Sequence, residues 1–147
     1  MSILGPQSNT GKSYFINQIE CWLKYTMNLH PEDYTLKRIV TYKGGPQYEI
    51  NMNGRDVDLK YFRLNELPDY IQFGEIKNGS FDCSESQLSS AKGFPHAVGK
   101  RFNCRDSKII SLDGMPKEVG EHFVWTNSPF TEEEIRSKVK VTGRVYR

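Results

Sequence analysis

The chain has 147 residues, of which 37% are hydrophobic and 12% aromatic, and its formal net charge is +2. This length suits one domain and the apolar content suits a buried core, which excludes an intrinsically disordered chain. The net charge is too small to indicate a nucleic acid partner by itself.

Nothing in the sequence indicates export, membrane insertion or a metal site. No apolar run approaches the ~18 residues of a membrane span, and the N-terminus lacks the charged and apolar regions of a secretion signal. The three cysteines, Cys21, Cys83 and Cys104, are odd in number and show no C-x-x-C spacing. This pattern argues against a disulfide framework or a zinc site. We therefore expect a cytoplasmic protein with free thiols, no metal and no cofactor.

The first residues contain the one motif that suggests catalysis. Gly5–Ser13 resembles a phosphate-binding P-loop, in which backbone amides and a lysine hold the phosphates. The consensus G-x-x-x-x-G-K-[ST] has four residues between its glycines, whereas five lie between Gly5 and Gly11. The motif should also follow a buried strand, but only Met1–Leu4 precede it. We predict a loop over residues 1–12 and keep nucleotide binding through Lys12 as an alternative function.

A helix is predicted over residues 13–29, because one stripe of residues recurs at helical spacing. The stripe consists of Phe15, Ile19, Trp22, Leu23 and Thr26. Residues 34–42 and 48–52 are rich in β-branched and aromatic residues and are separated by a Gly-Gly-Pro turn, which predicts a hairpin. The predicted N-terminal segment, residues 1–54, therefore comprises an arm, a helix and a hairpin.

The rest of the chain is organised by a repeat. Three similar rows, FDCSESQL, FNCRDSKI and FVWTNSPF, begin at Phe81, Phe102 and Phe123, which are 21 residues apart. The first two rows stay in register downstream through the pairs Gly93 and Gly114, Pro95 and Pro116, Val98 and Val119, and Gly99 and Gly120. A period near 20 residues is typical of a solenoid. A degenerate earlier rung begins at Val57, 24 residues before Phe81.

The composition of each row predicts a short strand followed by a bend. Side chains alternate along a strand, so Phe81 and Cys83 point to one side and Asp82 and Ser84 to the other. The small polar residue after the strand can bond backbone groups at the bend. One rung buries little surface by itself, so neighbouring rungs must stack. We predict a right-handed solenoid over residues 55–130, with parallel strands near 57–59, 80–84, 101–105 and 122–126.

The C-terminal segment, residues 131–147, begins with a capping box, Thr131 at the N-cap and Glu134 at N3. This predicts a short helix over 132–139 that caps the solenoid, followed by an extended tail. Basic residues accumulate here: Arg136, Lys138, Lys140, Arg144 and Arg147. They form either a solvated cap surface or a contact for an acidic partner.

At these residues the chain resembles a family, the leucine-rich-repeat-like proteins of tailed bacteriophages, whose units read like FDCSxNxLxSLxGxPxxVG. The matching stretches here are FDCSESQLSSAKGFPHAVG and FNCRDSKIISLDGMPKEVG, in which Ser86 and Ser107 replace the usual Asn and Ala91 replaces a core Leu. An IExWL-like helix at Ile19–Leu23, a VDL at Val57–Leu59 and an LPxxIxFGxIxGSF-like approach at Leu67–Phe81 are also similar.

The fold class that follows is α+β in one structural domain: a short leucine-rich-repeat-like solenoid of 21-residue period. An N-terminal helix and hairpin and a short C-terminal helix are expected to cap it. The resemblance implies a phage protein acting inside a bacterium, with a host protein, such as a defence component, as its partner. The oligomeric state is left open.

We expect a binding module and not an enzyme, because no serine or cysteine has an evident base partner. Solenoids present a face made from the outward residues of successive strands. The residues assigned to partner binding are Asp82, Ser84, Arg101, Asn103, Arg105, His122, Val124 and Thr126. Asp56, Asp58, Lys60 and Ser80 extend this face, which grades from acidic to basic. A weak nucleic-acid contact through Arg101, Arg105 and the basic tail is the remaining alternative, disfavoured by the nearby acidic residues.

Overall fold

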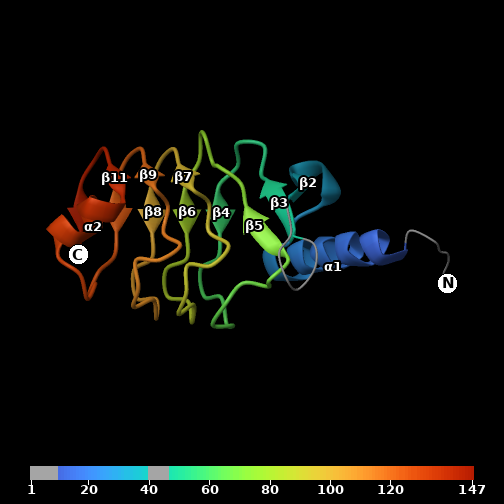
Figure 1. Ribbon diagram of the computed structural model, residues 1–147, viewed down its shortest axis with the longest axis horizontal. Coiled ribbons are helices and arrows are strands. Elements are labelled where there is room, and N and C mark those ends of the chain that lie inside the picture. The colour runs from blue at the N-terminus through green and yellow to red at the C-terminus, as the bar shows by residue number, and fades with distance from the viewer. Residues whose placement is uncertain (1–9, 40–46) are drawn as a thin grey trace.

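The computed structural model describes residues 10–39 and 47–147, with side chains from residue 16 onward, and has two α-helices at opposite ends of a coil of short strands (Figure 1). The N-terminal elements are α1 (Thr10–Met27), the 3-10 helix η1 (Pro31–Asp33), β2 (Thr35–Ile39) and β3 (Gln47–Asn51). The remaining elements are β4 (Val57–Asp58), β5 (Ile71–Phe73), β6 (Phe81–Asp82), β7 (Ala97–Val98), β8 (Phe102–Asn103), β9 (Glu118–Val119), β10 (Phe123–Val124), α2 (Glu132–Lys138), β11 (Lys140–Val141) and β12 (Val145–Tyr146).

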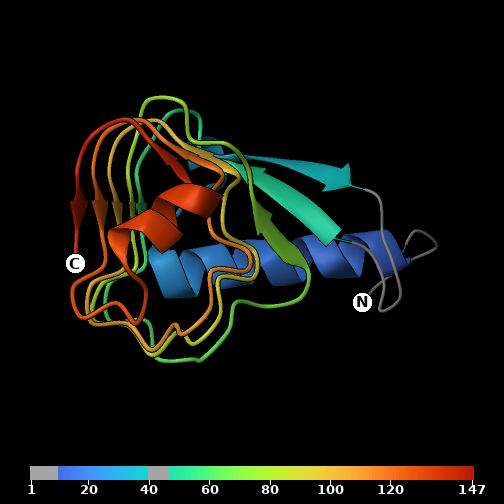
Figure 2. The ribbon, with the colours of Figure 1, turned by 60° about the vertical axis from the view of Figure 1, so that its left-hand side comes forward.

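The chain forms a β-solenoid of about four turns with parallel strands. A five-stranded front sheet has the order β12-β10-β8-β6-β4. From β4 to β12 its strands begin 24, 21, 21 and 22 residues apart. In Figure 2 the C-terminal end of the coil is turned toward the viewer, and the successive turns lie one behind another with closely similar paths. The four predicted parallel strands and the 21-residue spacing of the three phenylalanine rows are confirmed.

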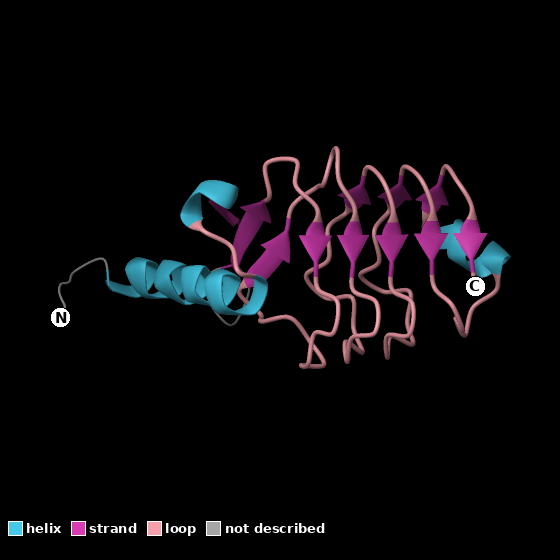
Figure 3. Cartoon of the chain, turned by 180° about the vertical axis from the view of Figure 1, so that it is seen from behind, coloured by secondary structure: helices cyan, strands magenta, loops and turns pink. Residues whose placement is uncertain are grey.

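A second sheet lies behind the first and a third attaches the hairpin. The back sheet consists of β7, β9 and β11, extended by a bridge between Ile76 and Val98 (Figure 3). The third sheet pairs β2 with β3 antiparallel, which confirms the predicted hairpin, and β3 with β5 parallel. The predicted Gly-Gly-Pro turn of the hairpin lies outside the described residues.

Columns of identical or similar side chains fill the interior. Phe81, Phe102 and Phe123 are fully buried, and their neighbouring ring centroids lie 5.6 Å and 5.1 Å apart. Phe94 packs against the first two rings at 4.7 Å and 6.0 Å. Backbone bonds hold the column in register, because the N–H of Phe81 donates to Arg101 O and that of Phe102 to His122 O, both at 2.9 Å. Apolar contact and the backbone ladder therefore repeat together at every turn.

Glycine is required where one turn passes directly over the next. Gly99 and Gly120 occupy the same place in successive turns, just after the back-sheet strands. A methyl group on Gly99 would overlap the carbonyl oxygen of Lys77, and one on Gly120 would overlap the carbonyl oxygen of Gly99. The Val-Gly pairs of the repeat thus mark the tightest approach between turns.

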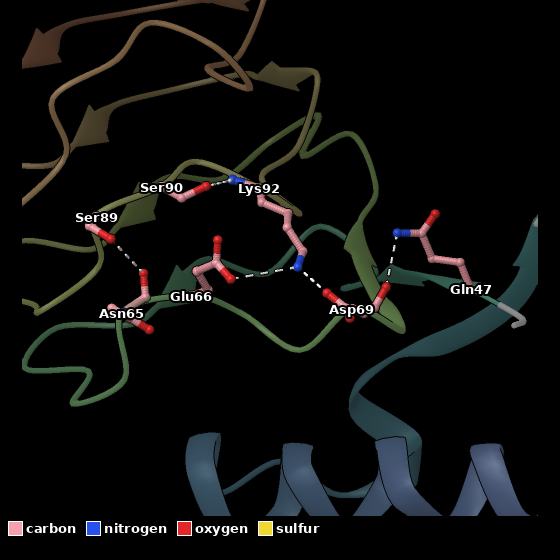
Figure 4. Close-up of polar contacts among 7 residues, drawn as sticks. All are labelled: Gln47, Asn65, Glu66, Asp69, Ser89, Ser90 and Lys92. Atoms are coloured by element: carbon pink, nitrogen blue, oxygen red, sulfur yellow. Dashed lines mark hydrogen bonds and ion pairs between the residues drawn. The ribbon is translucent and has the colours of Figure 1, made fainter. Parts of the chain in front are cut away.

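Polar contacts also link the first two turns, between the segment that precedes β5 and the matching segment of the next turn. Lys92 Nζ forms ion pairs with Glu66 and Asp69, and Ser89 donates to Asn65 O from both its N–H (2.9 Å) and its hydroxyl (3.3 Å) (Figure 4). The amide of Gln47 donates to Asp69 O at 3.2 Å and ties β3 to the same turn.

Each helix buries one face against the end of the coil nearest to it. In α1 the predicted stripe is partly confirmed: Ile19 and Leu23 are buried, while Thr26 is exposed. Half-buried Trp22 meets Phe62 of the first turn edge-on, at 6.1 Å between centroids. In α2 Ile135 is buried, and Thr131 and Glu134 form the predicted capping box.

The segment after α2 differs from the sequence-based expectation of an extended tail. It continues both sheets, because β11 pairs in parallel with β9 and β12 with β10. Val141 lies beside Val119 and Val145 beside Phe123, so valine takes the inward positions of one further rung. The parallel sheets therefore extend beyond residue 130.

Replacing Phe102 by alanine is expected to destabilise the fold strongly, because this ring contacts the turns on both sides. A Phe→Ala change in a packed core costs ~3–5 kcal/mol, which corresponds to a melting temperature lower by roughly 6–20 °C. Ile110→Ala is the control, since Ile110 is 76% exposed. Equal melting temperatures for the two variants, measured by circular dichroism, would contradict the stacked column.

Gly120→Ala is expected to destabilise by ~1–3 kcal/mol, because the new methyl group must displace backbone of the preceding turn. Gly74→Ala is the matched comparison, since its methyl group would meet chiefly the movable side chain of Glu49, at 3.2 Å. Chemical denaturation should place Gly120→Ala clearly below Gly74→Ala in stability, and the reverse order would be inconsistent with this packing.

Candidate binding face

The candidate site is the outer surface of the front sheet, called here the front-sheet face. Its central row holds one residue from each strand in register: Asp58, Asp82, Asn103, Val124 and Tyr146. This row is flanked on one side by the residues that precede each strand and on the other by the turns that follow. The face therefore joins residues that are up to 88 positions apart in the sequence.

Seven of the eight residues assigned to binding from the sequence are accessible on this face. Arg101 and Arg105 are exposed, and the half-buried members are Asp82, Asn103, His122, Val124 and Thr126. Ser84 is only 2% exposed, and its hydroxyl donates to Asp82 Oδ1 at 2.7 Å. The prediction that Ser84 is accessible is therefore wrong. The strand ends at Asp82, and the chain then bends, so the alternation that would have turned the Ser84 side chain outward no longer applies.

The acidic and amide side chains of the central row fold back over their own turns. Asp58, Asp82 and Asn103 each accept, through Oδ1, a bond from the backbone N–H two residues later, at 3.0, 2.9 and 3.0 Å. These Asx turns end the strands after two residues and lead into left-handed residues, among them Glu85 and Asp106 at φ 54° and 56°. These bonds fix the backbone that follows three of the five residues of the row.

The two arginines that flank β8, Arg101 before it and Arg105 after it, differ in their partners. Arg105 pairs with Glu85 at 3.3 Å on the preceding turn and with Asp106 at 3.6 Å. Within the described part of the chain, Arg101 forms no ion pair, and its backbone N–H donates to Ser80 Oγ at 3.2 Å. Exposed pairs contribute only ~0–1 kcal/mol, so either guanidinium is available to a partner at small cost.

The fifth strand adds two residues that the sequence analysis assigned to a tail. The N–H of Arg144 donates to His122 Nδ1 at 3.0 Å, and the His122 ring meets Tyr146 edge-on at 5.5 Å between centroids. Because Nδ1 accepts this bond, Nε2 is the ring nitrogen that can donate one. Tyr146 is 44% exposed. The signal that identifies these residues is Val145, which follows Phe123 by 22 positions.

The cysteines of the repeat lie on the opposite, inward side of the same strands. Cys83 and Cys104 are fully buried, as predicted, and Cys21 is exposed. Burial raises the pKa of the Cys83 and Cys104 thiols, and the nearby Asp82 carboxylate raises both further. These thiols stay protonated and behave as small apolar groups.

Within residues 10–39 and 47–147, no group of three or more His, Cys, Asp and Glu side chains is arranged to hold a metal ion. Among the described helices, none combines the length and the apolar character needed to cross a membrane. The phosphate-binding hypothesis for Gly5–Ser13 falls on residues whose side chains lie outside the described part.

Comparisons of the chain with protein-family models, with curated proteins and with solved structures found no match.

Asp82→Ala is expected to destabilise the fold by ~1–3 kcal/mol, because the buried hydroxyl of Ser84 and its N–H would both lose their acceptor. Asp82→Asn is the matched control, since Asn103 accepts the same backbone bond one turn later. Urea titrations should separate Asp82→Ala from wild type and leave Asp82→Asn close to it. Equal losses in both variants would mean that the charge, and not the Asx turn, is what matters.

Proposed function

We propose that this protein is a binding module without catalytic activity, and that the front-sheet face recognises a protein partner. The observation that supports this proposal is the row of solvent-facing groups that runs across five strands from Asp58 to Tyr146. Parallel strands lie ~4.8 Å apart, so five of them present a row of side chains roughly 19 Å long.

The chemistry of this face favours a protein over a nucleic acid. Acidic Asp58 and Asp82 lie at one end, and basic Arg101 and Arg144 with aromatic Tyr146 lie toward the other. Arginine and tyrosine are frequent hot spots of protein interfaces, because guanidinium groups bind carboxylates in pairs and both side chains stack on apolar surface. A nucleic acid would be repelled by the acidic end. A partner with complementary charges of both signs fits the whole face.

We also propose that the solenoid is of the leucine-rich-repeat type found in tailed bacteriophages, with α1, the hairpin and α2 as caps at its ends. The repeated FDCS and FNCR rows, and the burial of Ile19, Leu23 and Ile135 against the coil, support this assignment. By analogy with that family, the partner is a host bacterial protein such as a defence component, met in the bacterial cytoplasm.

Reversing the charge of both front-sheet arginines, Arg101→Glu with Arg105→Glu, is expected to abolish capture of the partner. Like charges in an interface cost several kcal/mol, whereas loss of exposed ion pairs costs ~0–1 kcal/mol of stability. The measurement is affinity capture from bacterial lysate with identification by mass spectrometry. Titration of the purified partner by calorimetry follows.

Lys117→Glu with Lys140→Glu is the charge-matched control. Lys140 is an exposed residue of the back sheet, and its backbone N–H donates to the carbonyl oxygen of Lys117 at 2.8 Å. This variant should retain capture, and both variants should melt within a few degrees of wild type. Retained binding by the arginine variant, or equal loss in both, would refute the front-sheet face as the site.

A further inference from the structure

We propose that the hollow between the end of α1 and the first solenoid turn is a second docking site, which takes an acidic peptide segment carrying an aliphatic or aromatic side chain. This Tyr25–Tyr61 hollow has a volume of about 360 Å³ and is lined by Tyr25 and Thr26 of α1 and by residues 58–64. The hollow shares Asp58 with the front-sheet face, but the proposal goes beyond that face and does not depend on what the face binds.

Exposed apolar side chains concentrate at this hollow. Five large apolar residues of the described chain are exposed, and three of them line it: Tyr25, Tyr61 and Leu64, at 77%, 66% and 59% exposure. The other two, Ile110 and Tyr146, are 76% and 44% exposed and do not line it. Large apolar groups gathered around a depression indicate a binding surface, because scattered exposure would need no explanation.

Tyr61 is the bulkiest of the residues at a position that is left-handed in every turn of the repeat. It has φ 63°, and the corresponding residues of the next turns are Glu85, Asp106 and Asn127 at φ 54°, 56° and 66°. Asp and Asn tolerate this left-handed conformation, whereas a bulky ring there is a steric outlier. Since the Tyr61 ring is mostly exposed, burial does not offset this cost. Strained residues of this kind cluster at ligand clamps.

The charges around the hollow decide what it accepts. Two basic residues, Lys60 and Arg63, line it. The single lining carboxylate, Asp58, is 3.9 Å from Lys60 Nζ, and Arg63 makes no ion pair in the described part of the chain. The rim is therefore net basic, which favours an acidic segment whose apolar side chain enters between the two tyrosine rings.

A neighbouring hollow limits the direction of the bound segment. Tyr25 also lines a depression of about 340 Å³ on its other side, together with Glu20, Lys24 and His30. The Glu20 carboxylate offsets the charge of Lys24 there, so that depression lacks the net positive charge of the Tyr25–Tyr61 hollow. The acidic part of the peptide is therefore expected on the Tyr61 side of the Tyr25 ring.

The test is selection of a displayed library of short random peptides on the full-length protein. The peptides recovered are expected to combine several acidic residues with one large apolar residue. The best of them, labelled with fluorescein, should bind about tenfold or more weakly to Tyr61→Asn and to Arg63→Glu in anisotropy titrations. Tyr61→Asn should melt at or above the wild-type temperature, because Asn127 occupies the equivalent turn at φ 66°.

Lys117→Glu is the control and should bind the peptide like wild type. Enrichment of no peptide, enrichment of basic peptides, or undiminished binding to Tyr61→Asn would each overturn the proposal. The front-sheet arginine pair lies outside this hollow, so failure here leaves the proposal for the front-sheet face standing, and failure there leaves this one standing.

Discussion

The whole structure depends on the in-register stacking of one turn on the next. The ring centroids of Phe81 and Phe102 lie 5.6 Å apart, and those of Phe102 and Phe123 lie 5.1 Å apart. The backbone hydrogen bonds between their strands recur from each turn to the next. Neither element suffices alone, because two-residue strands carry few backbone bonds and an isolated rung exposes most of its apolar side. Glycine at 99 and 120 permits the close approach that both need.

This stacking also determines what the surface can do. Because every turn repeats the previous one, outward residues align into rows, and the Asx turns of Asp58, Asp82 and Asn103 recur along the central row. The residues proposed to bind a partner thus lie at the ends of the strands and in the turns beside them. Tyr61 breaks the regularity of the turns and does so where α1 meets the coil, beside Tyr25. The regular outward positions form the front-sheet face, and the departure at Tyr61 marks the second candidate site.

The parallel rungs could be predicted from the sequence, because Phe102 and its equivalents recur at a fixed spacing that the stacking of turns explains. Sequence reasoning missed the fifth rung, because Val145 is smaller than the phenylalanines and is surrounded by basic residues that suggest a solvated tail. It placed Ser84 outside, because alternation along a strand cannot show that the strand ends after two residues. The Tyr25–Tyr61 hollow joins a helix to a turn, and its two rings are 36 positions apart, so no local pattern reveals it.

The central claim, that consecutive turns stack in parallel register, is tested most directly by proton contacts between phenylalanine rings. A NOESY spectrum of the protein with isotopically labelled phenylalanine, assigned through single Phe→Leu variants, measures them. The account predicts cross-peaks from the Phe102 ring to the rings of both Phe81 and Phe123, whose centroids lie within 5.6 Å of it. Absence of contact from Phe102 to either ring, or direct contact between Phe81 and Phe123 alone, would contradict the stacked solenoid.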